Sequence, residues 1–237
     1  MERNYQLVTT TTSKSAEFID SVLRLKPKLA VFDCDGTLWA GDAGEGFFDW
    51  ELKRGLLPDD IARKARSRYA DYKAGKVQED MMCGEMVTMH RGLPETTLQQ
   101  AATQFFDETF ATRIFPEMRT LIEKLLSLGC DIWAVSSTNE WVIQAAMTHF
   151  GVDSKQILAA AVEIEDGRVT DRLLRVPSGE GKPRAIREVV KKDPDAAFGN
   201  SRWDAEMLAM ARYAFAVNPN PDLEKLAKER GWTVYRP

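Results

Sequence analysis

Several kinds of residue and segment are scarce or absent in this chain of 237 residues, and each absence argues against a class of function or site. The two histidines and three cysteines (Cys34, Cys83 and Cys130) lack the spacing of a zinc site, and an odd cysteine count gives no disulfide framework. No apolar run is long enough to cross a bilayer, and the polar first 14 residues lack the apolar core of a signal peptide. Basic residues form no stripe, and the net charge of −4 argues against nucleic acid or anionic membranes as partners. These absences predict a cytoplasmic protein with no nucleic-acid or membrane partner. We expect a monomer or homodimer, although the composition does not decide between them.

The order of apolar runs and turn residues predicts an α/β fold. Hydrophobic residues make up 44% of the chain, which is enough for a packed core. Strands are expected at 29–32, 131–135, 196–198, 214–217 and 233–235, with a hairpin over 159–174 that turns at Asp166-Gly167. Helices are expected at 15–25, 117–128, 140–150, 183–192, 204–212 and 221–230. Strands that alternate with helices in this way form a parallel, Rossmann-like sheet covered on both faces.

The stretch from about 41 to 113 differs from the rest, because helical patterns follow one another there without a strand. Pro58 and Pro94, each followed by an acidic residue, mark two of the helix starts. An all-helical segment of this length inserted into an α/β protein is typical of a second, smaller domain. We expect an α/β core formed by 1–40 and 112–237 and a helical domain formed by 41–111.

The segment Asp33-Cys34-Asp35-Gly36-Thr37 directly follows the first predicted strand. Because side chains alternate along a strand, Asp33 and Asp35 can share one face while Cys34 points into the packing. Two crowded carboxylates are costly unless a cation or a proton lies between them. At the carboxyl end of a parallel sheet, where ligands bind, this pair predicts a metal-assisted site with one nucleophilic and one acid–base carboxylate. The alternative is a pair of turn aspartates that cap the next segment.

Of three further polar segments, two follow predicted strands and one lies in a glycine loop. Each has side chains that could bind a phosphate group or a cation. Ser136-Ser137-Thr138-Asn139 precedes a helix, whose N-terminus can bind phosphate, although an ordinary helix cap has the same pattern. Lys182 lies in a glycine loop and could neutralise phosphate, unless it is a solvated loop lysine. The segment from Gly199 to Asp204 offers oxygen ligands for a hard cation.

The order of these four segments resembles the haloacid dehalogenase superfamily of phosphohydrolases, and the helical insert resembles the cap of its phosphoserine phosphatase-like branch. The family pattern is Asp-x-Asp-x-Thr, then Ser or Thr, then Lys, then an acidic Gly-Asp-x-x-x-Asp-like motif. Asp33, Asp35 and Thr37 match the first motif, and the others match at Ser136, Lys182 and Asn200/Asp204. The resemblance covers nearly the whole chain and implies a hydrolase of phosphoric monoesters.

The resemblance implies a role for each matched residue. Asp33 would attack phosphorus and carry an aspartyl-phosphate, and Asp35 would protonate the leaving oxygen and later deprotonate water. Lys182, with Thr37 and the serines at 136 and 137, would bind the transferring phosphoryl group. Family members that act as dehalogenases lack the second aspartate, so Asp35 favours a phosphatase.

The resemblance also implies a Mg²⁺ ion held by Asp33, the backbone carbonyl of Asp35 and the fourth motif, Asn200 with Asp204. Here the sequence departs from the family, which has an aspartate where this chain has Asn200. Because a carboxylate binds Mg²⁺ more strongly than an amide, either Asp204 takes over direct ligation or metal affinity is reduced. A catalytically weakened ligand-binding homologue is therefore one alternative, and a phosphoryl-transferring mutase is another.

The substrate implied by the resemblance is a small phosphomonoester under a closing cap. Asp42 lies where phosphoserine phosphatases bind the substrate ammonium, with Glu45 one turn further. The place of their carboxylate-binding arginine falls near Gly84, and Arg91 is out of register. An ammonium pocket without a carboxylate clamp favours an amine-bearing ester of the phosphoserine, phosphoethanolamine or phosphocholine type.

Other conspicuous side chains have a structural and a functional reading. Four aromatic residues could form a cation–π wall, although core packing is the commoner fate: Phe47, Phe48, Trp50 and Trp141. His90 and His149 are lone histidines on helical segments, for which a structural place is expected. Four methionines are expected to pack between helices: Met81, Met82, Met86 and Met89.

Overall fold

A computed structural model describes residues 3–237 of the chain, and their side chains from residue 14 on. The prediction about a signal peptide concerns residues 1–14, and it lies almost entirely outside the part of the chain whose side chains are described. The first described element is the helix α1 (Arg3–Arg24). Among the described residues, no helix combines the length and the apolar character needed to cross a membrane.

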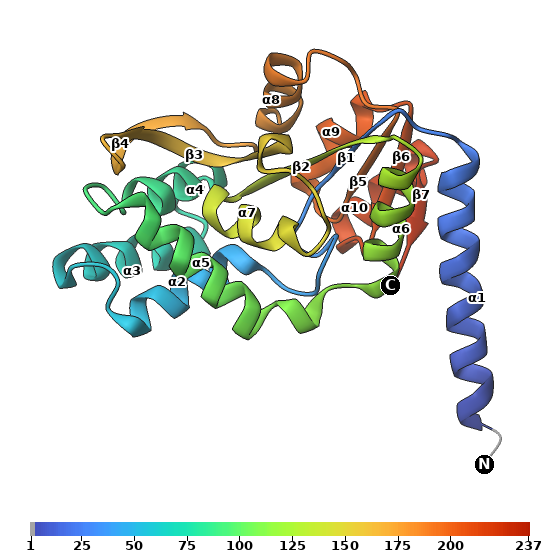
Figure 1. The fold of residues 1–237 in the computed structure, drawn as a ribbon, viewed down its shortest axis with the longest axis horizontal. Helices are drawn as coiled ribbons and strands as arrows, with labels where there is room; N and C mark the ends of the chain where they lie inside the picture. Colours follow the sequence, from blue (N-terminus) through green and yellow to red (C-terminus); the bar gives the residue numbers. More distant parts are fainter. Residues whose placement is uncertain (1–2) are drawn as a thin grey trace.

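Seven strands form one sheet in the order β4-β3-β2-β1-β5-β6-β7 (Figure 1). Its parallel strands are β1 (Leu29–Phe32), β2 (Asp131–Asn139), β3 (Ile157–Glu165), β5 (Ala196–Gly199), β6 (Tyr213–Val217) and β7 (Thr233–Tyr235). The last strand, β4 (Arg168–Arg175), pairs antiparallel with β3 through the predicted hairpin. The prediction of a Rossmann-like α/β core is therefore confirmed.

Helices cover both faces of the sheet because neighbouring residues of each strand point to opposite sides. Ala30 and Phe32 pack in one core cluster with residues of α1, α6 (Pro116–Ser127) and α7 (Glu140–Thr148). Val31 packs in the other with residues of α8 (Gly181–Val189), α9 (Ala205–Met210) and α10 (Pro221–Arg230). The fully buried β1 between them explains its uninterrupted apolar sequence.

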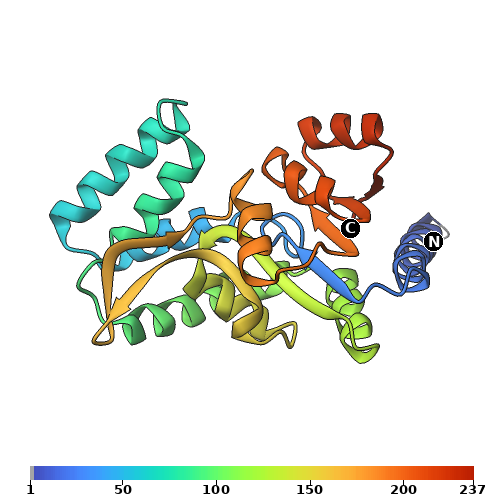
Figure 2. The same cartoon turned by 90° about the horizontal axis from the view of Figure 1, so that it is seen from above.

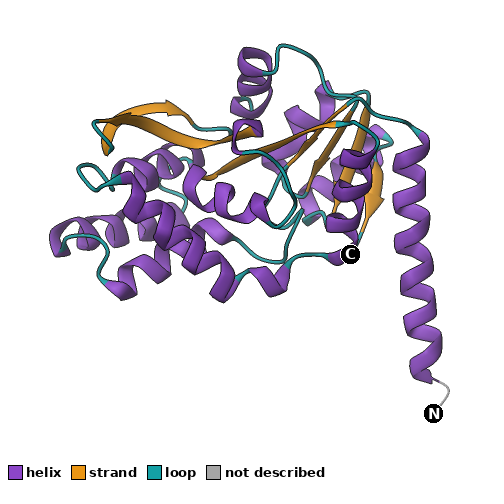
Figure 3. Ribbon diagram, viewed as in Figure 1, coloured by secondary structure: helices purple, strands orange, loops and turns teal. Residues whose placement is uncertain are grey.

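Between β1 and α6, the helix that precedes β2, the chain forms four α-helices, a short 3₁₀ helix (Ala111–Arg113) and no strand (Figure 3). The α-helices are α2 (Ala43–Arg54), α3 (Asp59–Lys73), α4 (Glu79–Thr88) and α5 (Glu95–Thr109). Pro58 and Pro94 are the N-caps of α3 and α5, as predicted. Figures 1 and 2 show these helices at the end of the molecule that is far from α1, near the β3–β4 end of the sheet. The β3–β4 hairpin reaches towards them, and the Gly92 amide donates to the Val169 carbonyl at 2.8 Å.

Two predicted boundaries near the expected site were wrong. The strand β2 continues past Val135 to Asn139, because Asn139 still pairs with Ala160 of β3 after a shift of register. Ser136 and its neighbours therefore belong to a strand and do not follow one. The helix α8 begins at Gly181, two residues earlier than predicted, so Lys182 lies in its first turn and not in a loop.

Candidate active site

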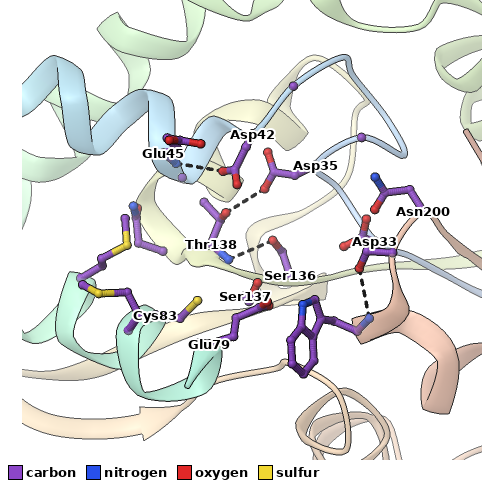
Figure 4. Close-up of a pocket in the computed structure, with 18 of the residues that line it drawn as sticks. Asp33, Asp35, Asp42, Glu45, Glu79, Cys83, Ser136, Ser137, Thr138 and Asn200 are labelled. Carbon is purple, nitrogen blue, oxygen red and sulfur yellow. Dashed lines mark hydrogen bonds between the residues drawn. The ribbon is translucent and has the colours of Figure 1, made fainter. Parts of the chain in front are cut away.

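A cavity of about 430 Å³ lies at the carboxyl ends of β1, β2 and β5, and residues of α2, α3 and α4 form its other walls (Figure 4). The carboxyl end of an open parallel sheet is the usual place for a ligand. Eight of the sequence-predicted site residues line this cavity: Asp33, Asp35, Asp42, Glu45, Ser136, Ser137, Lys182 and Asn200. Asp204 and Thr37 are themselves fully buried beside it.

Asp33 continues β1, since its amide donates to the Phe198 carbonyl at 2.9 Å. One carboxylate oxygen, Oδ2, accepts a hydrogen bond from Thr37 Oγ1 at 2.7 Å, and Oδ1 accepts one from Lys182 Nζ at 2.7 Å. Burial, together with the charge of Asp204, raises the pKa of Asp33 to about 6. Cys34 is fully buried in the core, so the predicted alternation of this segment is confirmed.

Asp35 also lines the cavity, but other donors hold its carboxylate. Its Oδ1 accepts from Trp39 Nε1 at 2.8 Å and from the Ala43 amide at 2.6 Å, and its Oδ2 accepts from Thr138 Oγ1 at 2.7 Å. Burial and the nearby charge of Asp42 raise the pKa of Asp35 to about 7. A carboxyl group that titrates near neutrality and is fixed by three donors is suited to give and take a proton.

Lys182 is almost completely buried between two carboxylates. Its Nζ lies 2.7 Å from Asp33 Oδ1 and 2.6 Å from Asp204 Oδ1, and it donates to the Val135 carbonyl at 2.9 Å. Burial alone would lower the pKa of Lys182, but the charges of Asp204 and Asp33 raise it above its usual value. The reading of Lys182 as a solvated loop lysine was therefore wrong.

The two candidate metal ligands of the fourth segment, Asn200 and Asp204, lie in different places. Asp204 lies outside the cavity lining, and its Oδ2 accepts from the amides of Asn200 at 2.9 Å and Ser201 at 2.8 Å. Asn200 lines the cavity, and its amide group lies so close to Gly36 that a Cβ there would be 1.9 Å from Nδ2. Gly36 also has a φ of +73°, so both its conformation and this contact require glycine.

The end of β2 contributes hydroxyl groups to the cavity wall. Ser136 is buried, and its Oγ accepts from the Thr138 amide at 3.1 Å. Thr138 was not predicted as a site residue, although its spacing of two from Ser136 on a strand places both on one face. Trp39 was also missed, because it lies four residues beyond Asp35 and reaches it through a turn.

The two acids at the start of α2 are engaged by the protein itself. Asp42 caps the helix, since its Oδ1 accepts from the Glu45 amide at 2.8 Å. Glu45 forms an ion pair with Lys73 of α3, with Nζ and Oε1 3.0 Å apart. Both carboxylates nevertheless line the cavity, as the sequence predicted for an ammonium pocket.

No arginine lines the cavity among the described residues. Gly84 packs against Leu173 and Val176, and Arg91 forms an exposed ion pair with Asp171 at 2.7 Å. Lys182 is the one cation in the lining of the described part of the chain. The cavity therefore offers negative charge and hydroxyl groups without a clamp for a substrate carboxylate.

The remaining conspicuous residues have mostly structural places. None of Phe47, Phe48, Trp50 and Trp141 lines the cavity, whose described aromatic residues are Tyr69, Tyr72 and Trp203. His90 is buried against Glu51 at 2.7 Å, and His149 pairs with Asp107 at 2.9 Å. Met82 and Met86 do line the cavity, which the prediction of pure helix packing missed.

Comparisons with known proteins indicate one family of enzymes for this chain. A sequence model of the haloacid dehalogenase-like hydrolases matches residues 30–209. A histidinol-phosphatase of Neisseria meningitidis is 28% identical over 218 residues, which cover 87% of this chain and 97% of that protein. The phosphoserine phosphatase SerB1 of Mycobacterium tuberculosis is 27% identical over 225 residues, covering 86% and 69%.

Solved structures with the same fold include two bacterial proteins of low sequence identity. A Bordetella pertussis protein of unknown function superposes with a TM-score of 0.77 at 23% identity, covering 87% of this chain and 97% of that one. A probable phosphoserine phosphatase of Vibrio cholerae has a TM-score of 0.62 at 18% identity, covering 87% and 59%. At these identities the likeness concerns the fold alone.

Proposed function

The chain belongs to the haloacid dehalogenase-like hydrolase family and is a phosphatase of a small phosphate ester, and we propose that this ester bears an amine and no carboxylate. The lining of the cavity carries this proposal. Acidic side chains surround it, Lys182 is its one cation among the described residues, and that lysine is already held by two carboxylates. Histidinol phosphate, the ester implied by the name of one relative, has this chemistry, whereas phosphoserine adds a carboxylate.

The proposed reaction uses the two aspartates in the order that their contacts favour. Asp33 attacks phosphorus to form an aspartyl-phosphate, while Lys182 and Thr37 fix its carboxylate and offset charge on the phosphoryl oxygens. Asp35 gives its proton to the leaving oxygen and then accepts one from the water that hydrolyses the aspartyl-phosphate. A pKa of about 7 suits both proton transfers at neutral pH.

The oxygen donors at this end of the cavity fit a Mg²⁺ ion. The Asp33 carboxylate, the Asp35 carbonyl and the Asn200 amide are hard ligands, and the excess of acids over cations favours a divalent cation. Among the described residues no three acidic, cysteine or histidine side chains form a metal cluster, so carbonyl and amide oxygens would complete the site. When bound, the ion supplies positive charge to the transferring phosphoryl group.

The helices α2–α5 are proposed to form the cap over this site, with 41–111 as the inserted domain and 1–40 with 112–237 as the core. Support comes from a small cluster of their own, formed by Phe48, Leu52, Leu57, Ala62 and Ala65. The cavity between cap and core would hold a small ester away from water.

A test of the proposed function is phosphate release from a panel of esters, with and without Mg²⁺. We expect histidinol phosphate and phosphoethanolamine to be hydrolysed with kcat/KM at least about tenfold above phosphoserine, because the phosphoserine carboxylate faces the acidic lining without a partner. A generic aryl phosphate serves as the reference for turnover itself. Preference for phosphoserine would contradict the proposal, and a fully inactive folded protein would favour the ligand-binding alternative.

Replacing Asn200 by aspartate is expected to lower the half-saturating Mg²⁺ concentration by about tenfold, because a charged oxygen replaces a neutral one beside Asp33. The measurement is initial rate against Mg²⁺ concentration at saturating ester. Asn220→Asp is the matched control, since Asn220 caps α10 outside the cavity lining. Equal Mg²⁺ dependence of Asn200→Asp and the unaltered protein would remove Asn200 from the metal site.

A further inference from the structure

Glu79 is an acid of the cavity that the sequence did not single out. It is the first residue of α4 and lines the cavity (Figure 4), and its Oε1 accepts a hydrogen bond from Ser178 Oγ at 2.9 Å. Ser178 belongs to the segment just before α8, the helix that holds Lys182. This hydrogen bond thus joins α4, one of the inserted helices, to the part of the core that holds Lys182.

Glu79 has no basic partner, in contrast to Asp33 and Glu45 of the cavity wall. Asp35 and Asp42 also lack one, but backbone amides of α2 donate to their carboxylates. Asp33 is paired with Lys182, and Glu45 with Lys73, whereas no lysine or arginine of the described chain lies within ion-pair distance of Glu79. Burial, followed by the charges of Asp204 and Asp42, raises the pKa of Glu79 to about 7. The hydrogen bond from Ser178 and the charge of Lys182 act in the opposite direction. A half-buried carboxylate without a cation is a costly arrangement that a bound cation would relieve.

Aromatic residues line the same cavity as this carboxylate. Trp203 lines the cavity with 44% of its surface exposed, although a tryptophan normally buries most of its ring. Trp203 and Glu79 both contact the segment before α8. The Gly179 amide donates to the Trp203 carbonyl at 3.1 Å, and Ser178 donates to Glu79. Tyr72 is close enough that burial and the Glu79 charge raise its pKa to about 12. An aromatic face attracts a cationic nitrogen group, and a carboxylate in the same cavity adds an opposite charge.

We propose that Glu79 and Trp203 are the specificity residues that bind the cationic nitrogen of the substrate. This inference rests on the proposed function, in which the ester bears an amine. It assigns the binding of that charge mainly to Glu79 and Trp203, in place of Asp42 and Glu45. Those two residues are engaged in capping α2 and in the ion pair with Lys73. Glu79 and Trp203 instead offer an unpaired carboxylate and an open ring.

The test compares two esters that differ only in charge, phosphocholine and its neutral carbon analogue 3,3-dimethylbutyl phosphate. Their dissociation constants are measured by calorimetry on the full chain carrying Asp33→Asn, so that neither ester is consumed. We expect the cation to bind about tenfold more tightly than the neutral analogue. In the double variant with Glu79→Gln this preference should disappear, and with Trp203→Leu it should fall about threefold.

Two comparisons separate this role from a general effect on the cap. Asp80→Asn removes the same charge from the neighbouring exposed position of α4, which does not line the cavity, and should leave the preference unchanged. The preference should also grow as the pH rises through about 7, because Glu79 becomes charged while both phosphate groups titrate alike and the choline charge is constant. With Glu79→Gln the preference should lose most of its dependence on pH, because Asp35, whose pKa is also about 7, is then the remaining group of the cavity that charges in this range.

The outcomes distinguish this inference from the proposed function. Equal affinity for the two esters, or a preference lost with Glu45→Gln but kept with Glu79→Gln, would overturn the assignment of Glu79. Failure of the unaltered protein to hydrolyse any amine-bearing or aryl phosphate would instead overturn the proposed function, because charge preference in binding is measured without turnover.

Discussion

Replacing Asp33 by asparagine is expected to lower kcat by about 10⁴-fold or more while the protein stays folded. The amide cannot attack phosphorus, but it has the size of the carboxylate and still offers an oxygen to Thr37 Oγ1 or Lys182 Nζ. Lys182 keeps a charged partner in Asp204, 2.6 Å away, so no buried charge is left alone. The measurement is phosphate release in the steady state, with thermal unfolding recorded on the same preparation.

Asp195→Asn is the matched control for this variant. Asp195 lies just before β5, at the opposite end of the sheet, where its Oδ2 accepts from the amides of Lys28 at 2.7 Å and Leu29 at 3.1 Å. Its loss should reduce stability by about 1 kcal/mol and leave the turnover of the folded protein unchanged. Turnover retained by Asp33→Asn would rule out Asp33 as the nucleophile, whatever the result for the control.

Elements with strong local signals were predicted to the residue. The helix α10 begins at Pro221 after the Asn220 cap and ends before Gly231, whose φ of +67° only glycine adopts readily. The strand β1 is an apolar run because it is buried on both faces. In contrast, the end of β2 depends on pairing with β3 around a register shift, and the polar residues after Val135 carry no local sign of that pairing.

The candidate site was predictable as far as it lies at strand ends. Asp33, Asp35 and Ser136 come together because parallel strands end at one edge of the sheet. Glu79 was missed because nothing in the sequence of α4 shows that its first turn meets Ser178, which is 99 residues away. Its contribution depends on how the inserted helices pack against the core, and only the three-dimensional structure contains that information.

The same limit applies to Lys182, whose sequence context is that of a solvated lysine and whose place is a buried ion pair. Lys182→Met is expected to lower kcat by about 10³-fold, because the positive charge beside the attacking carboxylate and the phosphoryl group is lost. It should also lower the free energy of unfolding by about 3–5 kcal/mol at pH 8, because Asp33 and Asp204 then remain buried without a cation. Methionine retains the length and the apolar stem of the side chain.

The pH dependence of this loss distinguishes an unpaired charge from poor packing. The pKa of Asp33 is already raised to about 6, and removal of Lys182 raises it further, so the variant binds protons in the folded state that the unfolded chain releases. The destabilisation should therefore be smaller at pH 5 than at pH 8 in urea unfolding experiments. Lys192→Met, at an exposed position, should change neither stability nor turnover. Destabilisation of Lys182→Met by the same amount at both pH values would mean that packing, and not the two carboxylates, accounts for the burial of this lysine.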